Sequence, residues 1–173
     1  TDTEPNMYVG TIINRSLADT TDSVTGLGDV HALLNAIGEM RRVAREAGFI
    51  AIKIDDVGDV NARFGFDAGD RVLAESAACL VECSRGKGRL FRSTGTTFVA
   101  LYDNLGPDEV DEIAEEIERF LGSPVLFGSF EYQPPIRVAT LHLDNVDRQP
   151  VSILTELNVL LEEAVQVPGT KLD

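Results

Sequence analysis

Three acidic residues follow a short apolar segment and could bind a divalent cation. Residues 49–54 (FIAIKI) are expected to form a buried strand, and Asp55, Asp56 and Asp59 come soon after it. Paired carboxylates at such a strand end commonly bind Mg²⁺ together with a phosphate-bearing substrate. The alternative is that these acids cap a turn and are solvated there. Because side chains alternate along a strand, Lys53 lies on the same face as Asp55, where a two-carboxylate site would need an acid.

Two further segments carry polar groups that a ligand could contact. Residues 65–70 (GFDAGD) precede an expected helix, and glycines before a helix N-terminus let a ligand approach backbone N–H groups. Asp70 is alternatively no more than a favourable negative charge in the first turn of that helix. Residues 94–97 (TGTT) offer hydroxyl groups but no carboxylate, so on their own they indicate a turn between two strands.

The spacing of apolar residues predicts the helices and strands that must position these side chains. Helices are expected over residues 30–47, 70–83, 107–121 and 151–164, and strands over residues 8–13, 49–54, 89–93, 98–102, 125–127, 130–132 and 136–143. Gly48 is expected to end the first helix. This order of elements predicts an α+β fold, in which helices flank a central mixed or antiparallel sheet.

The composition restricts the classes of partner and compartment. The 173 residues carry 15 Lys and Arg against 29 Asp and Glu, a formal net charge of −14, which disfavours nucleic-acid backbones and anionic membrane surfaces as partners. Cys79 and Cys83 are one helical turn apart, and we expect them on a buried helix face in a reducing compartment, the cytoplasm. The absence of an initial Met indicates a piece of a longer protein.

Three segments share the order and spacing of the motifs of one known family. Residues 22–27 (DSVTGL) are similar to a D-x-L-T-G-L motif, and residues 61–70 (NARFGFDAGD) are similar to N-D-x-x-G-H-x-x-G-D. Residues 92–98 (RSTGTTF) align with R-x-G-G-D-E-F, and an apolar strand follows. The chain therefore resembles a degenerate GGDEF (diguanylate cyclase-like) domain, which implies a nucleotide-cyclase or polymerase-palm type of fold. The degenerate signature comprises Thr94, Gly95, Thr96, Thr97 and Phe98.

The resemblance implies that the metal-binding acids of the family are replaced in this chain. Active members make cyclic di-GMP from two GTP molecules across a dimer, with two metal ions held by a strand Asp and a hairpin acid. These positions fall at Lys53, eight residues before Asn61, and at Thr96 and Thr97. A metal clamp on a phosphoryl group contributes several kcal/mol, and about 4 kcal/mol is a factor of about 10³ in rate. We therefore expect no Mg²⁺ at the family site, no required cofactor and no cyclase activity.

Other positions of the resemblance are partly retained. Asp55 matches the second strand Asp of the family, which is not counted as a metal ligand, whereas residues 57–58 (VG) replace an aromatic-Lys pair. The phosphate-binding Lys near the C-terminus falls at Val165 or Gln166. The nucleotide-binding site of this chain therefore differs from that of an active member at several positions besides the metal ligands.

The residues that would recognise a guanine base are retained. In the family an Asn and an Asp hydrogen-bond the base, and they match Asn61 and Asp70. An Asp that accepts from N1–H and from the exocyclic amine is specific for guanine. The chain is therefore expected to bind GTP without turnover, with the ammonium group of Lys53 near the phosphates in place of a metal. The alternative is that Asn61 and Asp70 are only turn and helix-start residues.

The product-inhibition motif of the family is incomplete in this chain. That motif is R-x-x-D, and the matching residues 85–88 (RGKG) retain Arg85 but have glycine in place of the Asp. Strong binding of cyclic di-GMP at this position is therefore not expected.

The domain organisation and function follow from the resemblance as expectations. Residues 1–21 are a lead-in from a preceding sensor domain, in which residues 8–13 form the last strand, and residues 22–173 are the GGDEF domain. The resemblance implies a catalytically inactive regulatory domain of a bacterial protein related to cyclic di-GMP, flanked by a sensor or phosphodiesterase (EAL) domain and able to form a homodimer. The alternatives are a ligand-free dimerisation or docking scaffold, and an active diguanylate cyclase or an enzyme with altered nucleotide chemistry.

Overall fold

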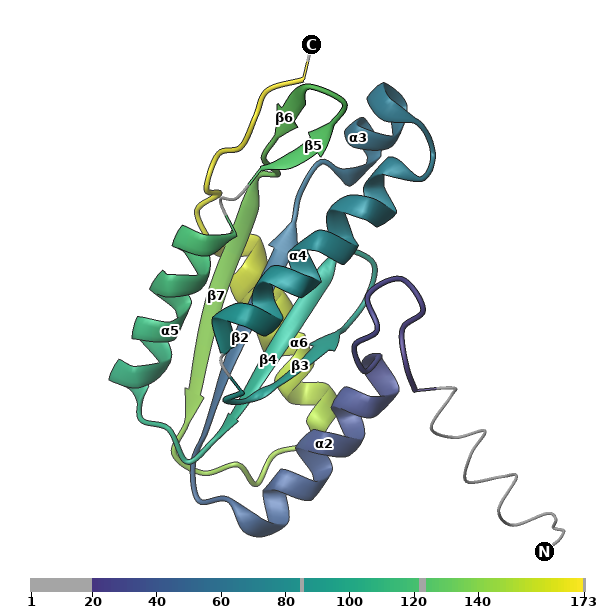
Figure 1. The fold of residues 1–173 in the computed structure, drawn as a ribbon. Helices are drawn as coiled ribbons and strands as arrows, with labels where there is room; N and C mark the ends of the chain where they lie inside the picture. Colours follow the sequence, from purple (N-terminus) through teal and green to yellow (C-terminus); the bar gives the residue numbers. More distant parts are fainter. Residues whose placement is uncertain (1–19, 85, 122–123, 173) are drawn as a thin grey trace, which may run out of the picture.

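A four-stranded antiparallel sheet forms the centre of the molecule (Figure 1). The computed structural model describes residues 20–84, 86–121 and 124–172. The strand order is β3-β4-β2-β7, and all three pairings are antiparallel. The strands are β3 (Arg89–Arg92), β4 (Thr97–Asp103), β2 (Ala47–Ile54) and β7 (Ile136–Leu143). The α+β class predicted from the sequence is confirmed, and the antiparallel alternative for the sheet is the correct one.

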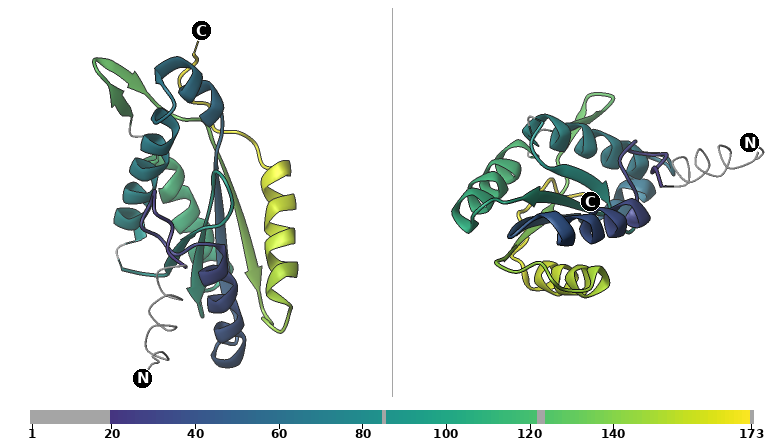
Figure 2. Two further views of the ribbon diagram at one scale, coloured as in Figure 1. Left: turned by 90° about the vertical axis from the view of Figure 1, so that its right-hand side faces the viewer. Right: turned by 90° about the horizontal axis from the view of Figure 1, so that it is seen from below.

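Helices cover both faces of this sheet, which gives the three layers seen in Figure 2. One face carries α2 (Val30–Val43) and α6 (Pro150–Glu163), and the other carries α4 (Ala68–Ser84) and α5 (Pro107–Phe120). A short helix α3 (Val57–Phe64) and a separate hairpin of β5 (Val125–Phe127) and β6 (Phe130–Tyr132) lie together beyond one end of the sheet. The rings of Phe64 and Phe127 stack there with centroids 4.3 Å apart.

The alternation of side chains along β2 divides the apolar interior into two cores. Ile52 and Ile54 belong to the core beneath α4 and α5, whereas Phe49 and Ala51 belong to the core beneath α2 and α6. Because successive residues of a strand point to opposite faces, Lys53 lies on the α2–α6 side, at the end of the strand. The strand thus brings a half-buried cation to the edge of an otherwise apolar core.

Most predicted elements are confirmed, and two differences concern β2 and the segment after it. The helix expected over residues 30–47 ends at Val43, and Ala47 and Gly48 belong to β2. Gly48 is therefore not a helix end; a Cβ atom at this position would lie 2.3 Å from Cγ2 of Val110, so a side chain does not fit where α5 crosses the strand. The helix α3 was not predicted, because Val60 is its only buried residue and gives no apolar stripe. The strand expected over residues 8–13 lies outside the described residues.

Candidate nucleotide site

Lys53 occupies the centre of a row of three polar residues across the sheet. It pairs with Thr97 on β4 and with Arg137 on β7. The N–H of Ile54 donates to the carbonyl oxygen of Thr96 at 3.0 Å, so Thr96 and Thr97 both lie next to the end of β2. Among the residues that the structure describes, Lys53 has no ion-pair or hydrogen-bond partner for its side chain. The residues matched to the metal-binding acids of the family are thus brought together, as one ammonium group and two hydroxyl groups.

The carboxylate of Asp55 is already hydrogen-bonded to other residues of the protein. Its Oδ2 accepts from Nε of Arg137 at 3.0 Å and from Nε2 of Gln166 at 2.7 Å, and its side chain is only 11% exposed. Arg137 also donates from Nη1 to the carbonyl oxygen of Ala164 at 3.0 Å, where α6 ends. Asp55 therefore links β2, β7 and the segment after α6. The sequence reasoning did not single out Arg137, because its partner is 82 residues away.

Replacing Arg137 with methionine is expected to destabilise the domain by about 1–3 kcal/mol, because the largely buried carboxylate of Asp55 would lose its cation. The lower end applies if Gln166 compensates. Urea unfolding measures this change, and the Asp55→Asn/Arg137→Met double variant is the control, since it removes the unpaired charge. The expectation is contradicted if Arg137→Met is as stable as the wild type, or if the double variant is much less stable than either single variant.

The hairpin predicted at residues 94–97 joins β3 to β4. The N–H of Ser93 donates to the carbonyl oxygen of Thr97 at 2.8 Å, and the N–H of Thr97 donates to that of Thr94 at 2.9 Å. Gly95 has φ of 53° at the tip, a conformation that favours glycine. The predicted turn is confirmed, and Thr97 is only 8% exposed.

The first and third motif segments contact each other through an ion pair. The carboxylate of Asp22 accepts from the N–H of Thr25 at 2.8 Å and from its hydroxyl at 2.7 Å. It also accepts from Nη1 of Arg92 at 3.1 and 3.2 Å, while Nε of Arg92 donates to the carbonyl oxygen of Gly95 at 2.9 Å. The loop that starts at Asp22 is therefore tied to the hairpin tip. Nothing in the motif spacing predicts this contact.

The stabilising effect of Asp22 is expected to disappear at low pH. Burial alone would raise the pKa of Asp22, but hydrogen bonds from Thr25 and Arg92 and the charge of Arg92 outweigh burial and hold that pKa below its ordinary value of 3.8. Because the pKa is lower in the folded state, the stabilisation is complete above pH 3.8 and is lost as the pH falls through the lowered value. We expect Asp22→Asn to lose about 1–2 kcal/mol at neutral pH. Urea unfolding at several pH values would contradict this if the difference from wild type stays constant down to pH ~2.

Asn61 and Asp70 meet where α3 ends and α4 begins. Oδ1 of Asn61 accepts from the N–H of Gly69 at 2.7 Å, which fixes the amide and leaves Nδ2 to donate elsewhere. A Cβ atom on Gly69 would lie 2.8 Å from this oxygen, so the close approach requires glycine. Asp70 is exposed in the first turn of α4, and its side chain makes no hydrogen bond or ion pair within the described part of the chain. Asn61 therefore has a helix-start role, and both side chains keep free hydrogen-bonding groups.

The acids that follow β2 do not converge on a common point. Asp56 has φ of 61° immediately before α3, and Asp59 is exposed in the first turn of that helix. Within residues 20–84, 86–121 and 124–172, one group of three ligand atoms lies close enough together to hold a metal ion, namely Glu46, His142 and Asp144. This group is at the opposite end of β2 and β7 from Lys53. The two ring nitrogens of His142 already face the carboxylates of this group: Nε2 lies 3.1 Å from Oε2 of Glu46, and Nδ1 lies 3.5 Å from Oδ1 of Asp144.

Two further sequence predictions concern Arg85 and membrane contact. Arg85, the remnant of the product-inhibition motif, lies outside the described residues. Among the described helices, none is both long enough and apolar enough to cross a bilayer.

The sequence matches a family model described as "Diguanylate cyclase, GGDEF domain" over residues 19–127. It is 29% identical over 84 residues to the diguanylate cyclase DgcS of Shewanella oneidensis, covering 46% of this chain and 28% of that protein. It is 28% identical over 119 residues to the cyclic di-GMP phosphodiesterase PdeR of Escherichia coli, covering 68% of this chain and 18% of that protein. The chain thus spans less than a third of the length of either relative.

Solved structures show the same fold. The diguanylate cyclase SiaD of Pseudomonas aeruginosa, solved in complex with its activator SiaC, superposes with a TM-score of 0.78 at 18% identity, over 92% of this chain and 64% of that one. The GGDEF domain of FimX from the same organism gives a TM-score of 0.77 at 16% identity, over 84% and 93% of the two chains. The family match covers most of the sheet and the segments that carry Lys53, Asn61, Asp70 and the hairpin. The chain belongs to the GGDEF domain family.

Proposed function

We propose that this GGDEF domain is catalytically inactive and acts as a regulatory domain in a larger protein of cyclic di-GMP signalling. The observation that supports this most directly is the row of Thr97, Lys53 and Arg137 across the sheet end. In the family that the motifs resemble, acids at the positions of Lys53 and of Thr96 and Thr97 would bind the catalytic metals. At the first of these positions stands an ammonium group that has no partner carboxylate among the described residues.

Electrostatics at this sheet end disfavour a divalent cation. Asp55, the nearest acid in sequence, is already neutralised by Arg137 and hydrogen-bonded by Gln166. Lys53 therefore adds an unpaired positive charge, and two unit positive charges at ~4 Å repel by about 4 kcal/mol at an effective dielectric of ~20. Hydroxyl groups at Thr96 and Thr97 do not compensate, because neutral oxygens are weaker Mg²⁺ ligands than carboxylates.

The same arrangement supports binding of a guanine nucleotide without a metal. Guanine presents two donors, N1–H and the exocyclic amine, beside the acceptor O6. The free carboxylate of Asp70 can accept from the two donors, and Nδ2 of Asn61 can donate to O6. With a base at the start of α4, phosphates that reach the end of β2 would meet the ammonium of Lys53, which supplies a positive charge where a metal ion would otherwise be needed.

Isothermal titration calorimetry with GTP in EDTA tests this binding. We expect saturable binding of GTP and at least about tenfold weaker binding of ATP, because adenine has no N1–H and places a donor where guanine has O6. Replacing EDTA with Mg²⁺ is expected to bring no gain in affinity. Equal affinity for GTP and ATP, or no heat with either, would contradict nucleotide recognition.

A ligand-free scaffold is the second candidate function, and one observation favours it. Oδ1 of Asn61 already accepts the N–H of Gly69, so this residue has a structural role whether or not a nucleotide binds. In either case the partners we propose are a flanking sensor or phosphodiesterase domain and a second copy of the domain in the cytoplasm. The resemblance to a relative named as a cyclic di-GMP phosphodiesterase supports this context.

A further inference from the structure

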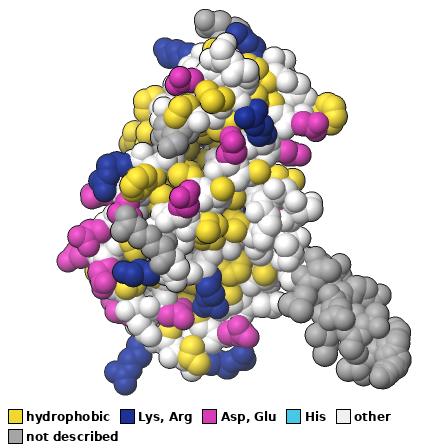
Figure 3. Space-filling model, in the orientation of Figure 1, with side chains coloured by type: hydrophobic (Ala, Val, Ile, Leu, Met, Phe, Trp, Pro, Cys, Tyr) yellow, Lys and Arg dark blue, Asp and Glu magenta, His cyan; other side chains and the backbone are white. Residues whose placement is uncertain are grey.

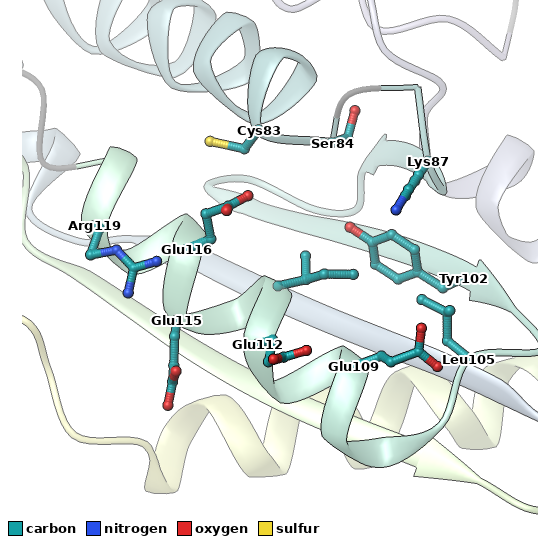
Figure 4. A pocket seen from close by; sticks show the side chains of 11 residues that line it. Cys83, Ser84, Lys87, Tyr102, Leu105, Glu109, Glu112, Glu115, Glu116 and Arg119 are labelled. Atoms are coloured by element: carbon teal, nitrogen blue, oxygen red, sulfur yellow. The ribbon is translucent and has the colours of Figure 1, made fainter.

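A cavity of about 460 Å³ lies between the end of α4, the strand β4 and one side of α5 (Figure 4). Ser84 and Lys87 line it where α4 ends and the chain leads to β3.

Four glutamates of α5 give this cavity a negative lining. Glu109, Glu112, Glu115 and Glu116 all contribute to it, against two cations, Lys87 and Arg119. None of the four glutamates forms an ion pair within the described part of the chain, and only the side chain of Glu109 has a hydrogen bond, from the N–H of Gly106 at 3.4 Å. Figure 3 shows acidic side chains gathered over α5. In Figure 4 the two cations stand at opposite ends of the cavity.

The largely buried side chain of Tyr102 brings its hydroxyl group to the wall of this cavity. The residue is only 2% exposed, and its hydroxyl has no hydrogen-bond partner among the described residues. Figure 4 shows this oxygen pointing into the space between α4 and α5. Burial, and to a smaller extent Cys83, raises the pKa of Tyr102 to about 12, so the group is a neutral phenol. The hydroxyl group is not one of the fully buried unpaired atoms of the described residues, so it is open to the cavity and can accept from a donor on a bound ligand.

We propose that this cavity binds basic side chains, arginine above all, of a partner protein. A guanidinium group carries five donors and no acceptor, and it fits carboxylates in a bidentate way. The phenol oxygen of Tyr102 can accept a further hydrogen bond. Leu105 and Ile113 add apolar surface to the lining. This surface suits the planar, weakly hydrated guanidinium group of arginine better than it suits the compact, strongly hydrated ammonium group of lysine. The phosphates of cyclic di-GMP would instead face unpaired carboxylates.

The spacing of the glutamates along α5 favours a protein segment over a small free cation as the ligand of this cavity. Glu112 and Glu116 are four residues apart on α5, about 6 Å along its axis. Two arginines four residues apart on a partner helix have the same spacing. Phe120, which is 46% exposed at the end of α5, adds an apolar surface for the partner to cover. This inference does not depend on nucleotide binding or on catalytic inactivity.

Fluorescence anisotropy with a labelled alanine-rich helical peptide, carrying two arginines four residues apart, tests the proposal. We expect saturable binding, at least about tenfold weaker binding to Glu112→Gln/Glu116→Gln, and no change with Glu162→Gln/Glu163→Gln, which removes the same charge from exposed positions on α6. A peptide with glutamines in place of the arginines should not bind. No saturable binding up to ~1 mM, or an equal loss in both double variants, would overturn the proposal.

The Tyr102→Phe variant distinguishes peptide binding in the cavity from non-specific attraction to an acidic surface. The variant keeps the ring and the net charge but removes the hydroxyl group, so we expect peptide affinity to fall about threefold or more while the unfolding midpoint changes little. Unchanged peptide affinity in this variant would overturn the role of the cavity. Spermine at the same concentration is expected to displace the peptide poorly. Full displacement by spermine would show that a small cation is sufficient and would overturn the protein-partner assignment.

Discussion

Asp70→Ala is expected to lower the affinity of the domain for GTP by at least about 100-fold in EDTA. The carboxylate would lose two charge-assisted hydrogen bonds to guanine, each contributing about 1.5–3 kcal/mol, and a total near 3 kcal/mol is about 100-fold in the dissociation constant. The folded state should change little, because Asp70 is exposed and its side chain has no partner among the described residues. Its only expected contribution to stability is a few tenths of a kcal/mol in the first turn of α4. Calorimetry measures the affinity, and urea unfolding measures the stability.

Two control variants make this result specific to the base. Glu75→Ala removes one carboxylate from the exposed side of the same helix and should leave GTP affinity within about twofold. Asp70→Asn should lose GTP but gain XTP, because xanthine carries an oxygen where guanine carries the exocyclic amine, and an amide can donate to it. If Asp70→Ala binds GTP as the wild type does, the base does not lie at the start of α4, and the assignment of Asn61 and Asp70 is wrong.

Gly48→Ala is expected to destabilise the domain by about 2–3 kcal/mol, although it adds a single carbon. The new Cβ would lie 2.3 Å from Cγ2 of Val110, which is itself 1% exposed and held between α5 and the sheet. Such a change is a large part of a typical stability of about 5–15 kcal/mol. Urea unfolding measures it, with the slope of the transition checked against that of the wild type.

Gly38→Ala is the matched control for this prediction. Gly38 lies inside α2, and apart from its chain neighbours and the backbone of the helix itself nothing lies within 4 Å of the position that a Cβ atom would take there, so alanine should stabilise the helix by about 0.5–1 kcal/mol. In a Val110→Ala background, Gly48→Ala should become nearly neutral, because the space it needs is then free. Equal stability of the two single alanine variants would show that α5 shifts without cost and would contradict the contact.

The helices and strands that depend on local apolar periodicity and on turn residues could be predicted from the sequence. The β5–β6 hairpin and β7 have the predicted bounds, because short apolar runs between turn residues leave few alternatives. Gly48 was misinterpreted, because a glycine after a helical pattern resembles a helix end, whereas its requirement comes from Val110, which is distant in sequence. The length of α2 was overestimated for the same reason, since Ala47 fits a helical stripe as well as a strand.

The candidate site was predictable in its positions but not in its contacts. Counting from Asn61 matched Lys53 to the strand Asp of the family, and the structure pairs Lys53 with Thr97 of the hairpin. The ion pair between Asp22 and Arg92 spans 70 residues, and no pattern in either segment indicates it. The acidic cavity beside α5 was also missed, because the glutamates of this helix resemble an ordinary solvated face until the fold places a buried tyrosine behind them.

The catalytic inactivity of the domain is the central claim, and a turnover assay tests it most directly. The chain is incubated with GTP and Mg²⁺, and cyclic di-GMP is measured by mass-resolved chromatography, with the relative DgcS as the positive control. Because Lys53, Thr96 and Thr97 stand where the resemblance places metal-binding acids, we predict at least about a 10³-fold lower rate than that of DgcS, with no dependence on Mg²⁺. Formation of cyclic di-GMP that requires Mg²⁺ and is abolished by Asp70→Ala would contradict the claim, because it would show that the site binds metal and turns GTP over despite Lys53.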